Sequence, residues 1–155
     1  MNIEGKKELF SLHVICTHVD EVNGDEKTRR LIKSPAVMMS EEQVKAGEIE
    51  KYYCQDVFFK GYIESDIFAG TVRDGGVDHQ IYKDGECVEL RAEYTLEGVD
   101  ADSNECSFDV VNKWGIDAWR PEISTDSKAL AFLNGADLIA VLEDGKFGPV
   151  IRFYL

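Results

Sequence analysis

The sequence has few basic residues and no long apolar run, and each shortage excludes a class of protein. Lysine and arginine number 17 against 30 aspartates and glutamates, which gives a net charge of −13. Because this charge repels phosphates and anionic lipid headgroups, we expect no nucleic-acid partner and no membrane partner. No apolar run approaches the ~18 residues of a membrane span, and the first residues lack the apolar stretch of a signal peptide. A cytoplasmic location is therefore expected.

The chain also lacks the motifs that hold metals and cofactors. Its 4 cysteines, Cys16, Cys54, Cys87 and Cys106, have none of the short paired spacings that build zinc sites or redox dithiols. Its 3 histidines are far apart, and it has no Gly-x-Ser-x-Gly elbow, phosphate-binding loop, dinucleotide fingerprint or His-Glu-x-x-His helix. We therefore expect no metal site and no cofactor, and we interpret the cysteines as reduced, buried and structural.

What the chain does contain is a series of short runs that alternate apolar and polar residues. Phe10, Leu12, Val14 and Cys16 show the period of two that is typical of a half-buried strand. Further strands are predicted at 28–32, 57–63, 67–72, 80–82, 88–96, 106–114, 137–142 and 150–155, with glycine and Asx turns between most of them. Residues 1–155 are thus predicted to form one mainly β domain with antiparallel strands, either a sandwich or a barrel.

Two segments are expected to be helical. Ser40 and Gln43 have the spacing of a capping box, and Glu41 and Lys45 have the favourable i,i+4 spacing, so a short helix is predicted at 41–51. Residues 127–134 are a candidate for a helical turn.

An ordered set of short segments carries a resemblance to a known family. The segments are Phe59-Lys60-Gly61, Phe68-Ala69-Gly70-Thr71-Val72, Gly75-Gly76-Val77-Asp78-His79-Gln80, Leu90-Arg91-Ala92-Glu93-Tyr94-Thr95-Leu96-Glu97-Gly98 and Asn112-Lys113-Trp114-Gly115. In their order and spacing the chain resembles the domain of unknown function 3237, also called uncharacterised protein family 0311. The resemblance implies a closed antiparallel β-barrel of lipocalin-like proportions and no settled activity. The chain departs from the family pattern at His79 and Glu93.

Four polar side chains are candidates for a ligand-binding site inside such a barrel. Asp78 and Gln80 are two residues apart, so on a strand they project to the same side, although Asp78 has the alternative role of capping the turn at Gly75 and Gly76. Tyr94 is the phenol of an otherwise apolar strand face, and it either makes a structural hydrogen bond or contacts a ligand. Asn112 is the one strongly polar member of its face and needs a neighbour, a water or a ligand as its partner.

Three hypotheses for function follow from these residues. In the first, the barrel binds a small apolar or aromatic metabolite through Asp78, Gln80, Tyr94 and Asn112. In the second, the protein is an enzyme of the cyclase, isomerase or hydrolase kind, with Asp78 as acid or base and Tyr94 or Asn112 stabilising charge. In the third, the barrel is filled by its own side chains and acts as a scaffold through oligomerisation. A homodimer is the oligomeric state we expect.

Overall fold

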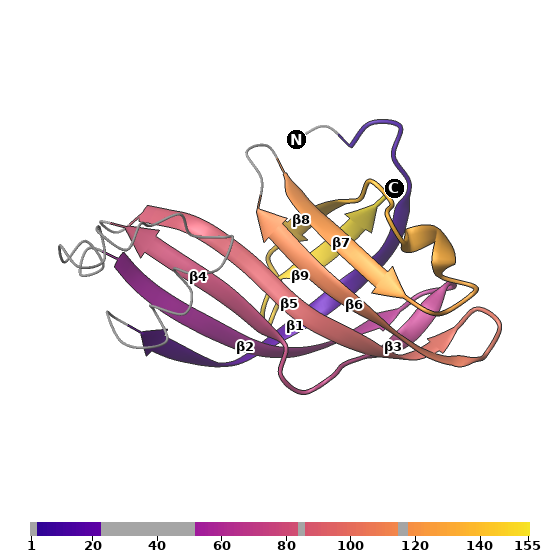
Figure 1. The fold of residues 1–155 in the computed structure, drawn as a ribbon, viewed down its shortest axis with the longest axis horizontal. Helices are drawn as coiled ribbons and strands as arrows, with labels where there is room; N and C mark the ends of the chain where they lie inside the picture. The colour runs from indigo at the N-terminus through magenta and orange to yellow at the C-terminus, as the bar shows by residue number, and fades with distance from the viewer. Residues whose placement is uncertain (1–2, 23–51, 84–85, 115–117) are drawn as a thin grey trace.

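A computed structural model describes residues 3–22, 52–83, 86–114 and 118–155 (Figure 1). Its nine strands belong to one antiparallel sheet. In chain order they are β1 (Glu8–Val22), β2 (Tyr52–Glu64), β3 (Phe68–Val72), β4 (Val77–Lys83), β5 (Glu86–Asp100), β6 (Glu105–Trp114), β7 (Trp119–Thr125), β8 (Ile139–Glu143) and β9 (Val150–Tyr154).

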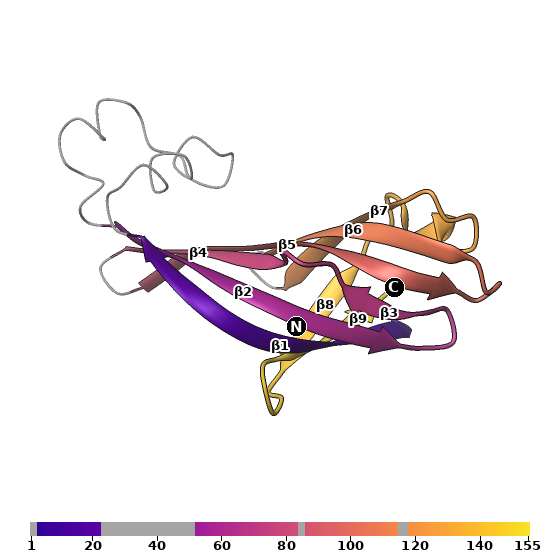
Figure 2. The same cartoon turned by 90° about the horizontal axis from the view of Figure 1, so that it is seen from below.

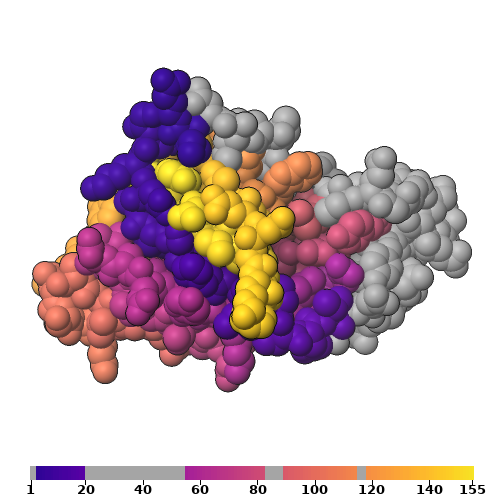
Figure 3. All heavy atoms as spheres, turned by 180° about the vertical axis from the view of Figure 1, so that it is seen from behind, coloured from indigo at the N-terminus to yellow at the C-terminus, as the bar shows by residue number. Residues whose placement is uncertain are grey.

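The sheet closes on itself to form a barrel. Its strand order is β1-β9-β8-β7-β6-β5-β3-β2, and β1 also pairs with β2, which removes the open edges. The strands β3 and β4 lie end to end between β2 and β5, so the nine strands fill eight positions around the barrel. Figure 3 shows the first and last strands side by side on the back of the molecule. The predicted closed antiparallel barrel is confirmed.

Aromatic side chains fill one end of the barrel. The rings of Phe10 and Phe153 lie 4.9 Å apart, and those of Phe68 and Phe108 lie 4.8 Å apart. Leu96 packs into the same core and, like these rings, is almost fully buried. These residues occupy alternate positions of their strands, which is why the period of two identified the core face.

The other end of the barrel is built from the three longest strands, β1, β2 and β5, together with β4. Strand β1 pairs with β9 only over residues 8–13, yet its pairing with β2 extends to Val22. Likewise β5 pairs with β4 over residues 86–93, and its pairing with β6 starts at Arg91. The strands β1, β2, β4 and β5 therefore extend past β6 to β9 as a continuation of the wall (Figures 1 and 2).

The wall is least regular between β7 and β8, where the only strand pairing is that of Trp119 with Ala140 among the described residues. The Asn134 amide accepts from the backbone nitrogen of Thr125 over 2.8 Å and donates to its carbonyl oxygen over 2.9 Å. In β7, the backbone N–H and C=O groups of every second residue point toward β8, and we call this boundary between β7 and β8 the seam. Pro121 is one of these residues, and proline has no N–H to donate across the seam. A side chain thus replaces part of the missing strand pairing.

Several details differ from the sequence predictions. Strand β7 was not predicted, and Cys16 is exposed rather than buried. The helical turn predicted within residues 127–134 is confirmed as a short 3₁₀ turn at Ala131–Leu133 (η2), in which Leu133 is buried, as is Leu130 just before it. The helix predicted at 41–51 and the strand predicted at 28–32 lie outside the described residues.

In the described part of the chain, no helix has the length and apolar character needed to cross a bilayer.

Candidate functional site

The candidate site is the polar end of the barrel interior, which takes its shape from a row of paired residues across neighbouring strands. Asp78 of β4 pairs with Ala92 of β5, and Ala92 in turn pairs with Asn112 of β6. Tyr94 is two residues further along β5 and therefore projects to the same side as Ala92. Because Ala92, Tyr94 and Asn112 are all buried, this side is the interior of the barrel. Ala92, with its small side chain, therefore lies between the Asp78 carboxyl group and the Asn112 amide.

A hydrogen-bond network holds the acidic side of this row. The Gln80 amide nitrogen donates to Asp78 Oδ2 over 2.7 Å. The Gln80 amide oxygen accepts from the Gln55 amide over 2.5 Å and from the Tyr82 hydroxyl over 3.0 Å. Asp78 is thus fixed by a side chain of its own strand face, and the bond that it accepts does not come from the turn at 75–76. The sequence did not single out Gln55 and Tyr82.

Three buried oxygens at this end have no hydrogen-bond partner among the described residues: Asp78 Oδ1, the Tyr94 hydroxyl and Asn112 Oδ1. Leaving a buried polar atom unpaired costs about 1 to 3 kcal/mol. Native proteins keep few such atoms, and those that remain call for a specific explanation. All three oxygens lie on one interior face, at the end of the barrel away from the aromatic plug formed by Phe10, Phe68, Phe108 and Phe153. This polar end is therefore a place where polar partners are needed.

The two titratable groups of this interior face, Asp78 and Tyr94, both have raised pKa values. Burial raises the pKa of Asp78, and the hydrogen bond from Gln80 partly offsets this effect. Burial also raises the pKa of the Tyr94 phenol, with a further increase from the negative charge of Asp78. The Tyr94 ring meets the ring of Phe59 edge to face at a centroid distance of 5.3 Å, which fixes its position.

The structure thus places the four predicted residues on one interior face. Asp78 and Gln80 are in direct contact, Asp78 influences Tyr94 electrostatically, and Asn112 lies across Ala92 from Asp78. Their role in ligand binding stays a prediction. Gln55 could have been suspected from sequence only with knowledge that β2 pairs with β4, because its own strand shows no polar pattern toward the interior.

The opposite face of the same strands carries a separate charged cluster. His79 Nδ1 lies 2.7 Å from Asp56 Oδ1, and His79 Nε2 lies 3.7 Å from Glu93 Oε2. Arg91 contacts the same Glu93 carboxylate. Since the Asp56 side chain is only 3% exposed, its pairing with His79 provides the partner that a buried carboxylate needs. We interpret this cluster as structural.

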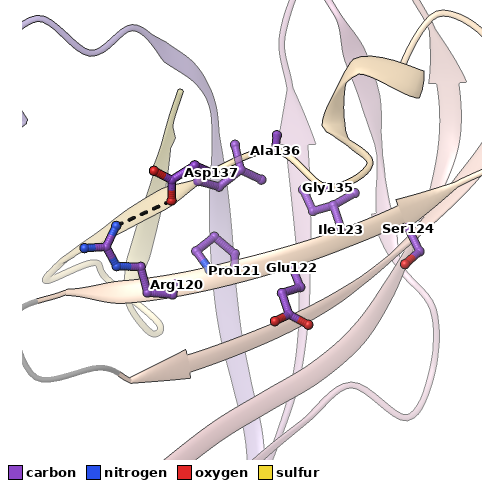
Figure 4. Close-up of a pocket in the computed structure, with 9 residues that line it drawn as sticks. Arg120, Pro121, Glu122, Ile123, Ser124, Gly135, Ala136 and Asp137 are labelled. Carbon is purple, nitrogen blue, oxygen red and sulfur yellow. Dashed lines mark ion pairs between the residues drawn. The ribbon is translucent and has the colours of Figure 1, made fainter.

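Two grooves lie outside the interior row. One has a volume of about 500 Å³ and follows the irregular seam between β7 and the segment before β8 (Figure 4). Arg120 and Asp137 approach to 3.7 Å across it. The other, of about 340 Å³, surrounds the turn after β5, where Asp100 Oδ1 accepts from the backbone nitrogens of Asp102 and Asn104. Within the described residues, no group of three or more His, Cys, Asp or Glu side chains is arranged to hold a metal.

Fold and site together define a closed antiparallel barrel with a filled end and a polar end, and solved structures share this fold. A protein of unknown function from Clostridium acetobutylicum ATCC 824 aligns with a TM-score of 0.66 at 17% identity, covering 99% of this chain and 98% of its own. A β-barrel-like protein from Acinetobacter baumannii AYE has a TM-score of 0.63 at 13% identity, with coverage of 96% and 93%. A conserved protein of unknown function from Rhodopseudomonas palustris has a TM-score of 0.62 at 14% identity and 97% coverage of both chains.

No family model matches the chain, and no curated protein matches it. Membership of the domain of unknown function 3237 family therefore stays a prediction, and the structural neighbours are evidence for the fold alone.

Proposed function

We propose that this protein binds a small molecule with an apolar or aromatic body at the polar end of its barrel, in contact with Asp78, Gln80, Tyr94 and Asn112. The observation that supports this most is the group of buried oxygens of Asp78, Tyr94 and Asn112 that lack partners among the described residues. A ligand donating hydrogen bonds to these atoms would remove a cost of about 1 to 3 kcal/mol for each.

The division of the barrel into two ends favours binding over a purely structural scaffold. The aromatic plug fills one end and supplies the hydrophobic core that the fold needs. A scaffold would gain stability from apolar side chains at the other end too, yet Asp78 and Asn112 are found there. Small barrels that bind one ligand combine a mostly apolar lining with a few polar groups that orient it.

Catalysis is the second candidate, and the raised pKa of Asp78 favours it. A carboxyl group whose pKa lies above its ordinary value is better matched to proton transfer near neutral pH. In this hypothesis Asp78 takes or gives a proton of the bound molecule, and Tyr94 or Asn112 stabilises the charge that develops.

Native mass spectrometry of the protein purified from its host tests the proposal. We expect a non-covalent adduct of small-molecule mass that disappears on denaturation. Ala92→Phe should abolish the adduct, because a phenyl ring at this position would lie between Asp78 and Asn112. Val111→Phe, at the neighbouring outward position of β6, is the matched control and should retain it.

Asn112→Leu provides a second test if Ala92→Phe does not fold, since it removes the amide at similar side-chain size. An adduct that survives both interior substitutions would contradict the proposed site. Two related masses, of which one grows with time in the wild-type protein but not in Asp78→Asn, would favour catalysis.

A further inference from the structure

At the polar end of the barrel the Asp78 carboxylate has no cationic partner on its own face among the residues that the structure describes. Interior and outer positions alternate along each strand, and the strand lysines, arginines and histidines whose side chains the structure describes occupy the outer positions. They are His13, His18, Lys60, His79, Arg91, Lys113, Arg120 and Arg152. His79 and Arg91 are already engaged by Asp56 and Glu93 on that outer face. Among the described residues, none of these cations forms an ion pair with Asp78.

Such a carboxylate needs positive charge or hydrogen-bond donors from another source. Buried charges in proteins are normally paired, because transfer out of water penalises the charged form heavily. Asp78 Oδ2 accepts the Gln80 amide, whereas Oδ1 is buried and has no partner among the described residues. Oδ1 is therefore the acceptor of this carboxylate that is left for a ligand.

The neighbouring groups favour the same kind of ligand. Asn112 Oδ1 is a second acceptor, so the row offers two acceptors on either side of Ala92. A protonated amine has only donors to give and matches them. The rings of Tyr94 and Phe59 lie beside this row, and aromatic faces attract cations. An anionic ligand would instead meet a carboxylate and an amide oxygen.

We infer that the ligand carries a protonated amine on a small apolar or aromatic body, with the ammonium group beside Asp78 Oδ1. This inference rests on the proposed function and adds the charge of the ligand to it. The amine forms an ion pair and hydrogen bonds with Asp78, while the body of the molecule lies over Ala92 and against the ring of Tyr94.

Three probes with the same ring but different charge test this assignment by isothermal titration calorimetry: phenethylamine, phenethyl alcohol and hydrocinnamate. The titrations use phosphate buffer, because an amine buffer would compete for the site. We expect phenethylamine to bind about tenfold more tightly than the alcohol, as a charge-assisted hydrogen bond implies, and hydrocinnamate to bind most weakly. Asp78→Asn should lower the affinity for phenethylamine to about that for the alcohol and so remove the preference for the amine.

The control for overall charge is Glu122→Gln, which removes one carboxylate from the exposed outer face of β7. It should leave all three affinities unchanged. An equal preference for amine and alcohol, or an amine preference that persists in Asp78→Asn, would overturn the inference. If the alcohol binds and Ala92→Phe abolishes its binding while no amine preference exists, the proposed function stands and only the ligand class is wrong. If none of the probes binds, both are overturned.

Discussion

At the scale of single residues, Asp78 links the stability of the protein to its proposed function. Burial raises its pKa, which means that the folded protein favours the protonated form more than the unfolded chain does. Ionisation of Asp78 near neutral pH therefore destabilises the folded protein. A ligand that pairs with the charged carboxylate restores this lost stability. Residues that stabilise a site when it is occupied and destabilise the empty protein are typical of binding and catalytic positions.

Asp78→Asn is expected to stabilise the ligand-free protein near neutral pH by on the order of 1 kcal/mol, because it removes a charge whose burial is unfavourable. The Asn side chain keeps an oxygen for the Gln80 amide and carries no charge. Urea unfolding monitored by circular dichroism as a function of pH measures the difference between variant and wild type.

The sign of the pH dependence follows from the raised pKa. Below the ordinary value of 3.8, Asp78 is protonated in both the folded and the unfolded wild-type protein, so the two proteins should differ least there. As the pH rises through 3.8 and then through the higher pKa of the folded state, the wild type loses stability relative to Asp78→Asn. Asp66→Asn, in an exposed turn, should show no such trend. A variant less stable than the wild type at neutral pH would contradict the expected cost of the charge.

At the scale of strands, the sequence predicts most of the barrel but little of its pairing. The period of two identified the interior faces of β1, β5 and β6, because hydrophobic burial on one face is a local property of each strand. It did not identify β7, where Pro121 lacks an N–H and the alternation is short. Its place in the barrel depends on its pairing with β6 on one side and on the contacts of Asn134 on the other.

For the candidate site, too, the sequence predicts the residues but not the strand pairing that brings them together. The sequence identifies four candidate site residues because each is a polar side chain in a strand or turn that is otherwise expected to face inward: Asp78, Gln80, Tyr94 and Asn112. Their placement in one row required the register of β4, β5 and β6, which a one-residue shift would have reversed. Gln55 was not found for this reason, since it joins the network only through the pairing of β2 with β4.

The seam between β7 and β8 leads to a prediction about Asn134. Asn134→Ala removes both hydrogen bonds to the Thr125 backbone and should lower the free energy of unfolding by about 1 to 3 kcal/mol. Hydrogen exchange of the Thr125 amide should accelerate more than that of amides in the β5–β6 pairing. Ser124→Ala, at the adjacent exposed position, is the control and should change neither quantity. Unchanged exchange at Thr125 would show that other contacts hold the seam.

At the scale of the whole molecule, the net charge of −13 means that carboxylates outnumber the basic side chains that could pair with them. Several cations form ion pairs at the surface; Arg152, for example, contacts Glu8 and Glu143, each over 3.0 Å, next to the junction of β1 and β9. Exposed pairs of this kind contribute about 0 to 1 kcal/mol each. With 30 acidic residues against 17 basic ones, repulsion among the unpaired carboxylates is expected to exceed these attractions.

Added salt should therefore stabilise the protein, although it weakens each surface ion pair. Raising NaCl from about 0.01 M to about 0.15 M shortens the screening length from about 30 Å to about 8 Å, which reduces repulsion between carboxylates on different strands. We expect the free energy of unfolding at neutral pH to rise by on the order of 1 kcal/mol in urea titrations. Near the isoelectric point of about 4.6 the net charge vanishes, so the same addition of salt should have little effect. If salt instead destabilises the protein at neutral pH, specific pairs such as those of Arg152 outweigh the net charge, and Arg152→Gln should then abolish most of the salt dependence.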